Sequence, residues 1–136
     1  MRDSFIRRVK AHEGFRSTPY KDTVGVWTFG HGLTYITEDE SDYIVRKRLD
    51  QINNVLSAKI NKFTSIPIDI REVLIEMAYQ MGVQGLLAFR LTLSLIQEGN
   101  YTSAADAMLE SKWASQTPVR AKELSDIVRN TAKWTN

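Results

Sequence analysis

The sequence contains no cysteine, and this absence excludes two kinds of scaffold. Without thiols, the chain of 136 residues has neither a disulfide framework nor a thiolate zinc site. A chain of this length buries about two thirds of its unfolded surface, which is enough to fold without such support. A hydrophobic content of 43% and a charged content of 25% are typical of globular proteins and exclude a disordered chain. We therefore expect one domain, residues 1–136.

Long apolar segments are missing as well. No run of about 18 apolar residues, the length that spans a bilayer, occurs in the sequence. The N-terminal residues MRDSFIRRVK carry basic side chains, but the apolar segment of a signal peptide does not follow them. We therefore expect no stable membrane insertion and no export by a signal of the chain's own.

A strong charge of one sign is also lacking. The formal net charge is +2, from 18 Lys and Arg residues against 16 Asp and Glu residues. The basic residues form three short groups that we interpret as solvated helix faces: Arg7, Arg8 and Lys10; Arg46, Lys47 and Arg48; and Arg120, Lys122, Arg129 and Lys133. Since no basic recognition helix stands out, we expect no nucleic-acid partner, whereas weak attraction to an acidic polymer is compatible with this charge.

Hydrophobic periodicity predicts a mainly helical α+β fold. A first helix, with Asp3 or Ser4 as its N-cap, ends at Glu13 because Gly14 follows. Thr37 and Glu40 have the spacing of a capping box. The helix that it opens carries one apolar stripe: Ile44, Val45, Leu49, Ile52, Val55, Leu56 and Ile60.

The second half of the sequence predicts a helical lobe. The run IREVLIEMAYQMG predicts a nearly buried central helix that opens at Pro67 or Asp69 and stops at Gly82. Further helices are expected at 84–88, 91–98 and 101–111, and then from Pro118, with Thr117 as the cap. The predicted segments are a first helix (1–13), a small β lobe (14–36), a connecting helix (37–62) and a helical lobe (63–136).

The β lobe is the one convincing β region, a small hairpin. In DTVG, Asp22 and Gly25 fit a type I turn with a three-residue loop, which pairs Asp22 with Val26. Thr28 then lies diagonally across from Asp22 on the same face, about 7–8 Å away between Cβ atoms, with room for one water. A two-residue loop would pair Asp22 with Trp27 instead and send Thr28 to the opposite face.

Glu13 and Asp22 form a candidate pair of catalytic carboxyl groups. Glycoside hydrolysis needs one carboxyl to protonate the leaving oxygen and another to direct a nucleophile or stabilise positive charge. The alternative is purely structural, with Glu13 as a surface helix end and Asp22 as a turn former. The pair alone does not decide between these two interpretations.

Three blocks of sequence carry a resemblance to a known family. HEGFRSTPYKDTVGVWTFGHG resembles the active-site segment of the phage-type lysozymes, which are endolysin muramidases. EMAYQMGVQGLLAF is similar to the central-helix segment of that family, and SKWASQTPVRAK to its C-terminal segment. The resemblance covers nearly the whole chain and implies a lysozyme-like fold of two lobes. It also implies cleavage of the β-1,4 bond between N-acetylmuramic acid and N-acetylglucosamine in peptidoglycan, with no metal or organic cofactor.

The resemblance further implies roles for individual residues. Glu13 is the expected general acid, and Asp22 and Thr28 are expected to hold the attacking water of an inverting reaction. A retaining reaction, with Asp22 as nucleophile and the carboxyl groups closer together, remains the alternative. Expected substrate contacts are Thr34, Tyr79, Gln80 and Thr92. Arg120 is expected to pair with Glu13, and Trp113 to pack in the core rather than to bind sugar.

The sequence departs from the family pattern at two places. Leu33 stands at the position of the usual histidine, while His31 lies between Gly30 and Gly32. We expect His31 to support the hairpin by local hydrogen bonding. Only two residues separate Thr34 from the capping box, where relatives carry a longer loop or an extra strand. The β lobe is therefore expected to be trimmed.

The resemblance favours an endolysin that is monomeric and waits in the host cytoplasm until a membrane lesion opens the way to the cell wall. A lytic transglycosylase, which attacks the same bond with one glutamate, is a close alternative that Asp22 and Thr28 argue against. A non-catalytic wall-binding module or a phage structural part is the alternative from another class. A DNA-binding helical domain is the weakest alternative.

Overall fold

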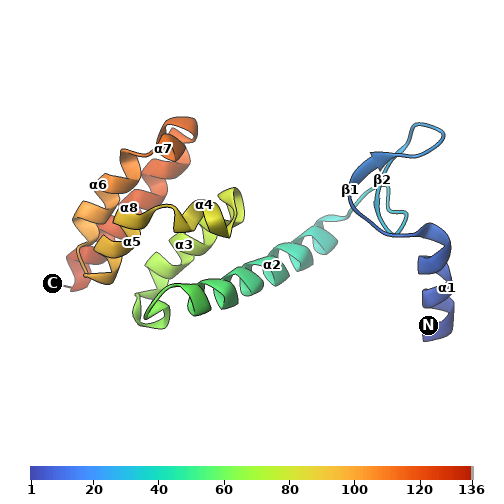
Figure 1. Cartoon of the computed structure of the whole chain (residues 1–136), viewed down its shortest axis with the longest axis horizontal. Coiled ribbons are helices and arrows are strands. Elements are labelled where there is room, and N and C mark those ends of the chain that lie inside the picture. The colour runs from blue at the N-terminus through green and yellow to red at the C-terminus, as the bar shows by residue number, and fades with distance from the viewer. Residues whose placement is uncertain (136) are drawn as a thin grey trace. The chain divides into compact units, whose positions relative to one another are not determined.

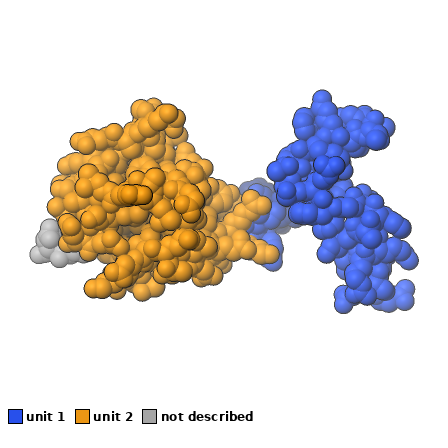
Figure 2. All heavy atoms as spheres, in the orientation of Figure 1, with its two compact units in different colours: residues 1–44 blue, residues 45–136 orange. Residues whose placement is uncertain are grey.

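The computed structural model describes residues 1–135, with side chains up to residue 131. The described chain is 69% helical, with a sheet of two antiparallel strands. This composition confirms the predicted α+β, mainly helical class. The chain divides into two compact units, which Figure 2 colours separately: unit 1 spans Met1–Ile44, and unit 2 begins at Val45. We describe each unit by itself.

Unit 1 contains helix α1 (Asp3–Glu13), strands β1 (Arg16–Lys21) and β2 (Trp27–Gly30), and the beginning of helix α2 (Glu38–Lys59), as Figure 1 shows. The strands pair Lys21 with Trp27, Tyr20 with Thr28, and Arg16 with Gly30. The register shifts between the last two pairs, where β1 contains Pro19. Proline lacks a backbone N–H, and such an irregularity is one of the few places where a sheet tolerates it.

The start of α1 differs from the prediction. The N-cap is Arg2 rather than Asp3 or Ser4, and no side chain caps the helix. The carbonyl oxygen of Arg2 accepts from the backbone N–H groups of Phe5 and Ile6. Asp3 is thus the first helical residue, where its negative charge interacts favourably with the positive end of the helix dipole.

The capping box at the start of α2 is confirmed. The backbone N–H of Thr37 donates to Glu40 Oε1 at 3.0 Å, and the N–H of Glu40 donates to Thr37 Oγ1 at 3.2 Å. The Thr37 hydroxyl also donates to Glu40 Oε1 at 2.8 Å. The hydrogen bonds from the Thr37 backbone and hydroxyl stabilise the carboxylate and lower the pKa of Glu40.

The helix opened by this box ends earlier than expected. α2 stops at Lys59, and Lys62 adopts a left-handed conformation with φ 58° before the 3₁₀ turn η1 (Phe63–Ser65). The predicted apolar stripe is buried only in its last part, where Leu56 and Ile60 are 0% and 5% exposed. Ile44 and Val55 on the same stripe are exposed.

The remaining helices of unit 2 are α3 (Ile68–Met81), α4 (Val83–Leu87), α5 (Arg90–Gln97), α6 (Tyr101–Leu109), α7 (Lys112–Gln116) and α8 (Pro118–Thr135). Pro67 is the N-cap of α3 and Gly82, with φ 83°, ends it, as predicted. The helix expected at 101–111 is shorter, and α7 was not predicted. Ser111 starts α7, because its hydroxyl accepts from the N–H of Ala114 at 3.1 Å.

The apolar core lies within unit 2. Helix α3 contributes five buried residues, Ile70, Val73, Leu74, Met77 and Ala78, which confirms a nearly buried central helix. Helix α8 packs against α3, α6 and α7, and α5 packs against α6. The core thus fixes the positions of α3 and α7, the two helices that carry Gln80 and Trp113.

Candidate active site

Glu13 is the last residue of α1, and its position is set by the way the helix ends. Gly14 adopts φ 69°, and its N–H donates to the carbonyl oxygen of Lys10 at 2.9 Å. The exposed Glu13 side chain reaches the turn after β2, where its carboxyl lies against Gly32. Among residues 1–131 no side chain forms a hydrogen bond or ion pair with this carboxyl. A carboxyl so placed is open to solvent and to a ligand.

Gly32 is a site residue that the sequence reasoning missed. It has φ 73°, a conformation that favours glycine, and a Cβ atom added to it would overlap the carboxyl of Glu13. Glycine is therefore favoured here both by the backbone conformation and by the position of the neighbouring acid. The sequence signal was present in the pair of glycines that flank His31.

The residues at and just before the start of β1 also contact the turn that follows β2. The ring of Phe15 lies 5.1 Å from the ring of His31, tilted by 47°, and Arg16 pairs with Gly30. Phe29 and Leu33 form a backbone bridge around the turn, with hydrogen bonds of 2.8 and 2.9 Å. His31 thus supports the hairpin by a ring contact; in the described part of the chain its imidazole forms no hydrogen bond of the expected kind.

Asp22 closes the hairpin loop in the predicted three-residue form. Its N–H donates to the carbonyl oxygen of Val26 at 2.9 Å, and Gly25 has φ 83°. Asp22 Oδ1 accepts from the N–H groups of Val24 and Val26 at 2.9 and 2.8 Å. These bonds confirm the pairing of Asp22 with Val26 and exclude the two-residue loop.

Thr28 lies on the same side of the hairpin. It pairs with Tyr20, is 6% exposed, and donates from its hydroxyl to the carbonyl oxygen of Val26 at 3.1 Å. Asp22 and Thr28 are therefore both hydrogen-bonded to the backbone of Val26. The structure brings these two predicted site residues together. The third, Glu13, lies beside Gly32, four positions after Thr28.

Thr34 follows the turn and is exposed. It belongs to the short segment that joins Leu33 to the capping box of α2. A sugar contact from Thr34 stays a prediction.

Two predicted substrate-binding residues of unit 2, Gln80 and Thr92, lie near Trp113. The indole N–H of Trp113 donates to Gln80 Oε1 at 2.9 Å, and Trp113 lines a hollow of about 340 Å³ together with Thr92. Trp113 is 7% exposed and meets the ring of Phe89 edge to face at 6.0 Å, so the expected packing role is confirmed. Thr92 is itself 3% exposed, which leaves little of its side chain for a ligand.

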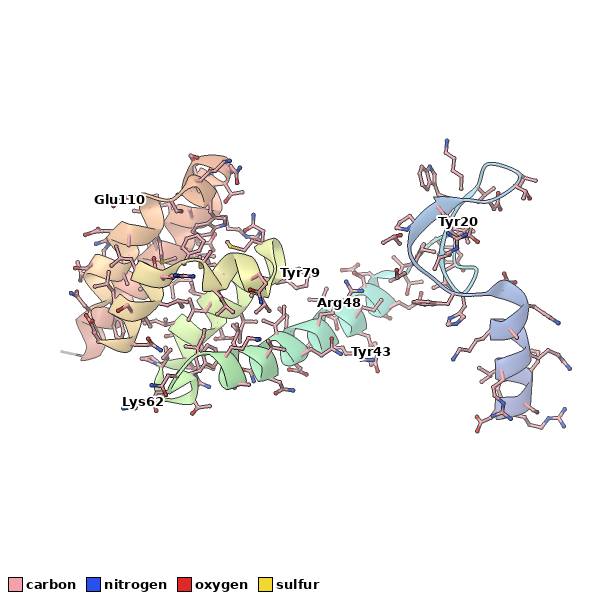
Figure 3. The ribbon with its side chains drawn as sticks, in the orientation of Figure 1. Tyr20, Tyr43, Arg48, Lys62, Tyr79 and Glu110 are labelled. Carbon is pink, nitrogen blue, oxygen red and sulfur yellow. The ribbon has the colours of Figure 1, made fainter. Side chains whose placement is uncertain are left out.

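Tyr79 and Arg120 lie elsewhere in unit 2. Tyr79, labelled in Figure 3, is 43% exposed and borders a groove of about 720 Å³ between α2 and α3. Arg120 Nε donates to Glu76 Oε2 at 2.9 Å, and both side chains remain partly exposed. Glu76 is thus a partner of Arg120 that the sequence reasoning missed. The pairing of Arg120 with Glu13 stays a prediction.

The described residues also bear on a metal site and on a membrane span. No group of three or more His, Asp or Glu side chains there is arranged to hold a metal ion. None of the helices described combines the length and the apolar character that a bilayer crossing requires.

Comparison with known proteins finds relatives that match most of the chain. Two relatives from Dictyostelium discoideum match: probable T4-type lysozyme 1, 28% identical over 156 positions that cover 88% of this chain and 90% of the relative, and probable T4-type lysozyme 2, 26% identical over 152 positions that cover 88% and 89%. Both alignments are longer than the 136 residues of this chain, so each relative has segments that the chain lacks. The predicted trimming of the β lobe stays a prediction.

The model of the family described as phage lysozyme matches residues 10–132. That range includes Glu13, Asp22, Thr28 and every other predicted site residue. The match supports a lysozyme activity, and with it a glycosidase that acts on peptidoglycan. The chain belongs to the phage lysozyme family.

Proposed function

We propose that the protein is an N-acetylmuramidase that cleaves the β-1,4 bond between N-acetylmuramic acid and N-acetylglucosamine in peptidoglycan. The observation that carries this proposal is the joint attachment of Asp22 and Thr28 to Val26. A carboxylate and a hydroxyl held at one backbone position are the groups that orient a water molecule for attack on a sugar carbon. Both are hydrogen-bonded to the backbone of the hairpin.

Glu13 is the general acid in this proposal. It donates a proton to the glycosidic oxygen as the bond from that oxygen to the anomeric carbon breaks. The water held by Asp22 and Thr28 attacks the anomeric carbon from the opposite face and gives a proton to Asp22, which inverts the configuration there. Gly32 supports this role, because the absence of a side chain there leaves space for the carboxyl of Glu13. Substrate contacts are assigned to Thr34, Tyr79 and Gln80, and Arg120 is assigned to pair with Glu13. The burial of Thr92 argues against the fourth contact that the resemblance implies.

The product identifies the reaction. An inverting hydrolase releases the α-anomer first, which NMR of a fresh digest of soluble glycan chains detects before mutarotation. Release of the β-anomer first would instead make Asp22 the nucleophile of a retaining enzyme. A 1,6-anhydro end, lighter by one water in mass spectrometry, would identify a lytic transglycosylase and contradict the hydrolase.

Glu13→Gln tests the catalytic assignment, because glutamine has nearly the same shape but no acidic proton to transfer to the leaving group. We expect the rate of turbidity clearing of bacterial wall suspensions to fall by about 10²–10⁴-fold, the usual contribution of a positioned general acid. Co-sedimentation with the walls should persist. An unchanged clearing rate would remove Glu13 from the mechanism, and a wild-type protein that binds walls without clearing them would be a non-catalytic binding module.

The proposed biological role is host-cell lysis by a monomeric endolysin that stays in the host cytoplasm until the membrane is breached. This role rests on the family resemblance. Expression in a bacterial cytoplasm should leave growth intact until a membrane-permeabilising agent is added, and lysis should then follow. The Glu13→Gln variant under the same treatment is the matched control. Light scattering after size exclusion measures the oligomeric state.

A further inference from the structure

Trp113 forms a hydrogen bond that does more than satisfy its own indole nitrogen. Its N–H donates to Gln80 Oε1 at 2.9 Å, which joins α7 to the last turn of α3. Trp113 is 7% exposed, whereas Gln80 is exposed. The bond therefore connects a fixed residue of the core with a side chain that faces solvent.

The chemistry of the two groups determines how the amide of Gln80 is oriented. An indole nitrogen donates a hydrogen bond and accepts none, whereas a glutamine amide has one oxygen that accepts and one nitrogen that donates twice. Only the amide oxygen can therefore face Trp113. The Nε2 group must point away from the indole, so Gln80 presents a donor to the surroundings rather than an acceptor.

The position of Trp113 is itself well supported. At the start of α7, the Ser111 hydroxyl accepts from Ala114 N–H, and at its end the Thr117 N–H and hydroxyl both donate to the carbonyl oxygen of Trp113, at 2.9 and 3.1 Å. The ring of Phe89 meets the indole edge to face at 85°. Because the backbone and ring of Trp113 are both held, its N–H is a fixed reference for Gln80.

We propose that Trp113 is a positioning residue that holds Gln80 with Nε2 as a donor to an acceptor oxygen of the glycan, either a sugar hydroxyl or an acetamido carbonyl. This inference rests on the proposed function. Without the indole N–H, the amide is free to turn and present its oxygen to the glycan. An amide oxygen cannot donate a hydrogen bond to an acceptor oxygen of a sugar, so this contact is lost. If only some of the molecules hold the amide in the orientation that binds glycan, the apparent affinity is lowered in proportion to the fraction of molecules that do.

Three variants test this inference by their steady-state kinetics on soluble uncrosslinked glycan chains. Trp113→Phe keeps an aromatic ring and removes the N–H, so KM should rise about twofold to fivefold with kcat nearly unchanged. Gln80→Glu still accepts from the indole but offers no donor, so KM should rise about threefold to tenfold. The double variant should show the KM of Gln80→Glu alone, because there is no longer a donor to orient.

A stability control separates positioning from folding. Val128 is fully buried in α8, and Val128→Ala should lower the unfolding midpoint while leaving KM unchanged. An unchanged KM in Trp113→Phe, or a KM in the double variant equal to the product of the two single effects, would overturn the inference. Substrate chains without N-acetyl groups identify the acceptor: if it is the acetamido carbonyl, Gln80→Glu has no effect on their KM. Failure of the wild type to cleave any glycan would instead reject the proposed function itself.

Discussion

The two units of the chain are held by different interactions. In unit 2, buried hydrophobic residues run from Leu56 to Val128 and connect helices that are distant in sequence. In unit 1, which is described in full, Thr28 is the one buried residue. The conformation of unit 1 is instead set by a capping box, a hairpin loop and glycines with positive φ. The predicted acid and water-holding residues therefore lie where short-range hydrogen bonds, rather than apolar burial, fix the backbone.

The largest expected effect tests this difference directly. Leu74 is fully buried on α3, and Leu74→Ala should lower the free energy of unfolding by about 2–5 kcal/mol, because it removes buried methyl groups and leaves a cavity. Val24 in the hairpin loop is 79% exposed, and Val24→Ala should change the free energy of unfolding by less than about 0.5 kcal/mol. Urea unfolding measures both. A loss at Val24 as large as that at Leu74 would mean that the hairpin loop is buried in solution.

A second effect concerns activity in unit 1. Gly32→Ala places a Cβ where the Glu13 carboxyl lies, and the flexible acid has to move. A displacement of about 1 Å in a catalytic group costs on the order of 100-fold in rate, so wall clearing should fall by about that factor.

Gly99→Ala is the matched control for this variant. Gly99 has φ 78°, similar to the φ of 73° at Gly32, but a Cβ there meets no atom. Both variants should lose about 1–2 kcal/mol of stability from the left-handed backbone, while only Gly32→Ala should lose activity. Equal activities in the two variants would show that the contact between Gly32 and Glu13 has no catalytic consequence.

A third and smaller effect tests the hairpin loop. Asp22 Oδ1 accepts from two backbone N–H groups, and asparagine retains such an oxygen. Asp22→Ala should therefore lower the free energy of unfolding by about 1 kcal/mol, whereas Asp22→Asn should change it by a few tenths. Thermal unfolding of both variants measures this difference. Equal losses would mean that the charge of Asp22, rather than its hydrogen bonds, holds the loop.

The contrast between the units also explains what the sequence could predict. The capping box and the three-residue loop involve residues three and four positions apart, so their chemistry is visible in a short window of sequence. The contact between Glu13 and Gly32 spans more of the chain, and the sequence offered only a pair of glycines as its signal.

In unit 2 the sequence predicted helices better than their contacts. The periodicity gave most of the helices, but it missed the five-residue α7, which is too short to show a repeat. The bonds of Trp113 to Gln80 and of Arg120 to Glu76 join residues 33 and 44 positions apart. Only the packing of the helices brings such pairs together, so no local pattern could have predicted them.

The smallest expected effect comes from the capping box itself. Hydrogen bonds from the Thr37 backbone and hydroxyl lower the pKa of Glu40 in the folded state, so folding favours its charged form. The stabilisation is complete above the ordinary carboxyl pKa and is lost as the pH falls through the lowered pKa of the folded state. Glu40→Gln should therefore melt slightly below the wild type at neutral pH, and the two melting temperatures should converge on acidification. Calorimetry from neutral to acidic pH measures the difference between the two melting temperatures. A difference that widens in acid would contradict a local, charge-dependent cap.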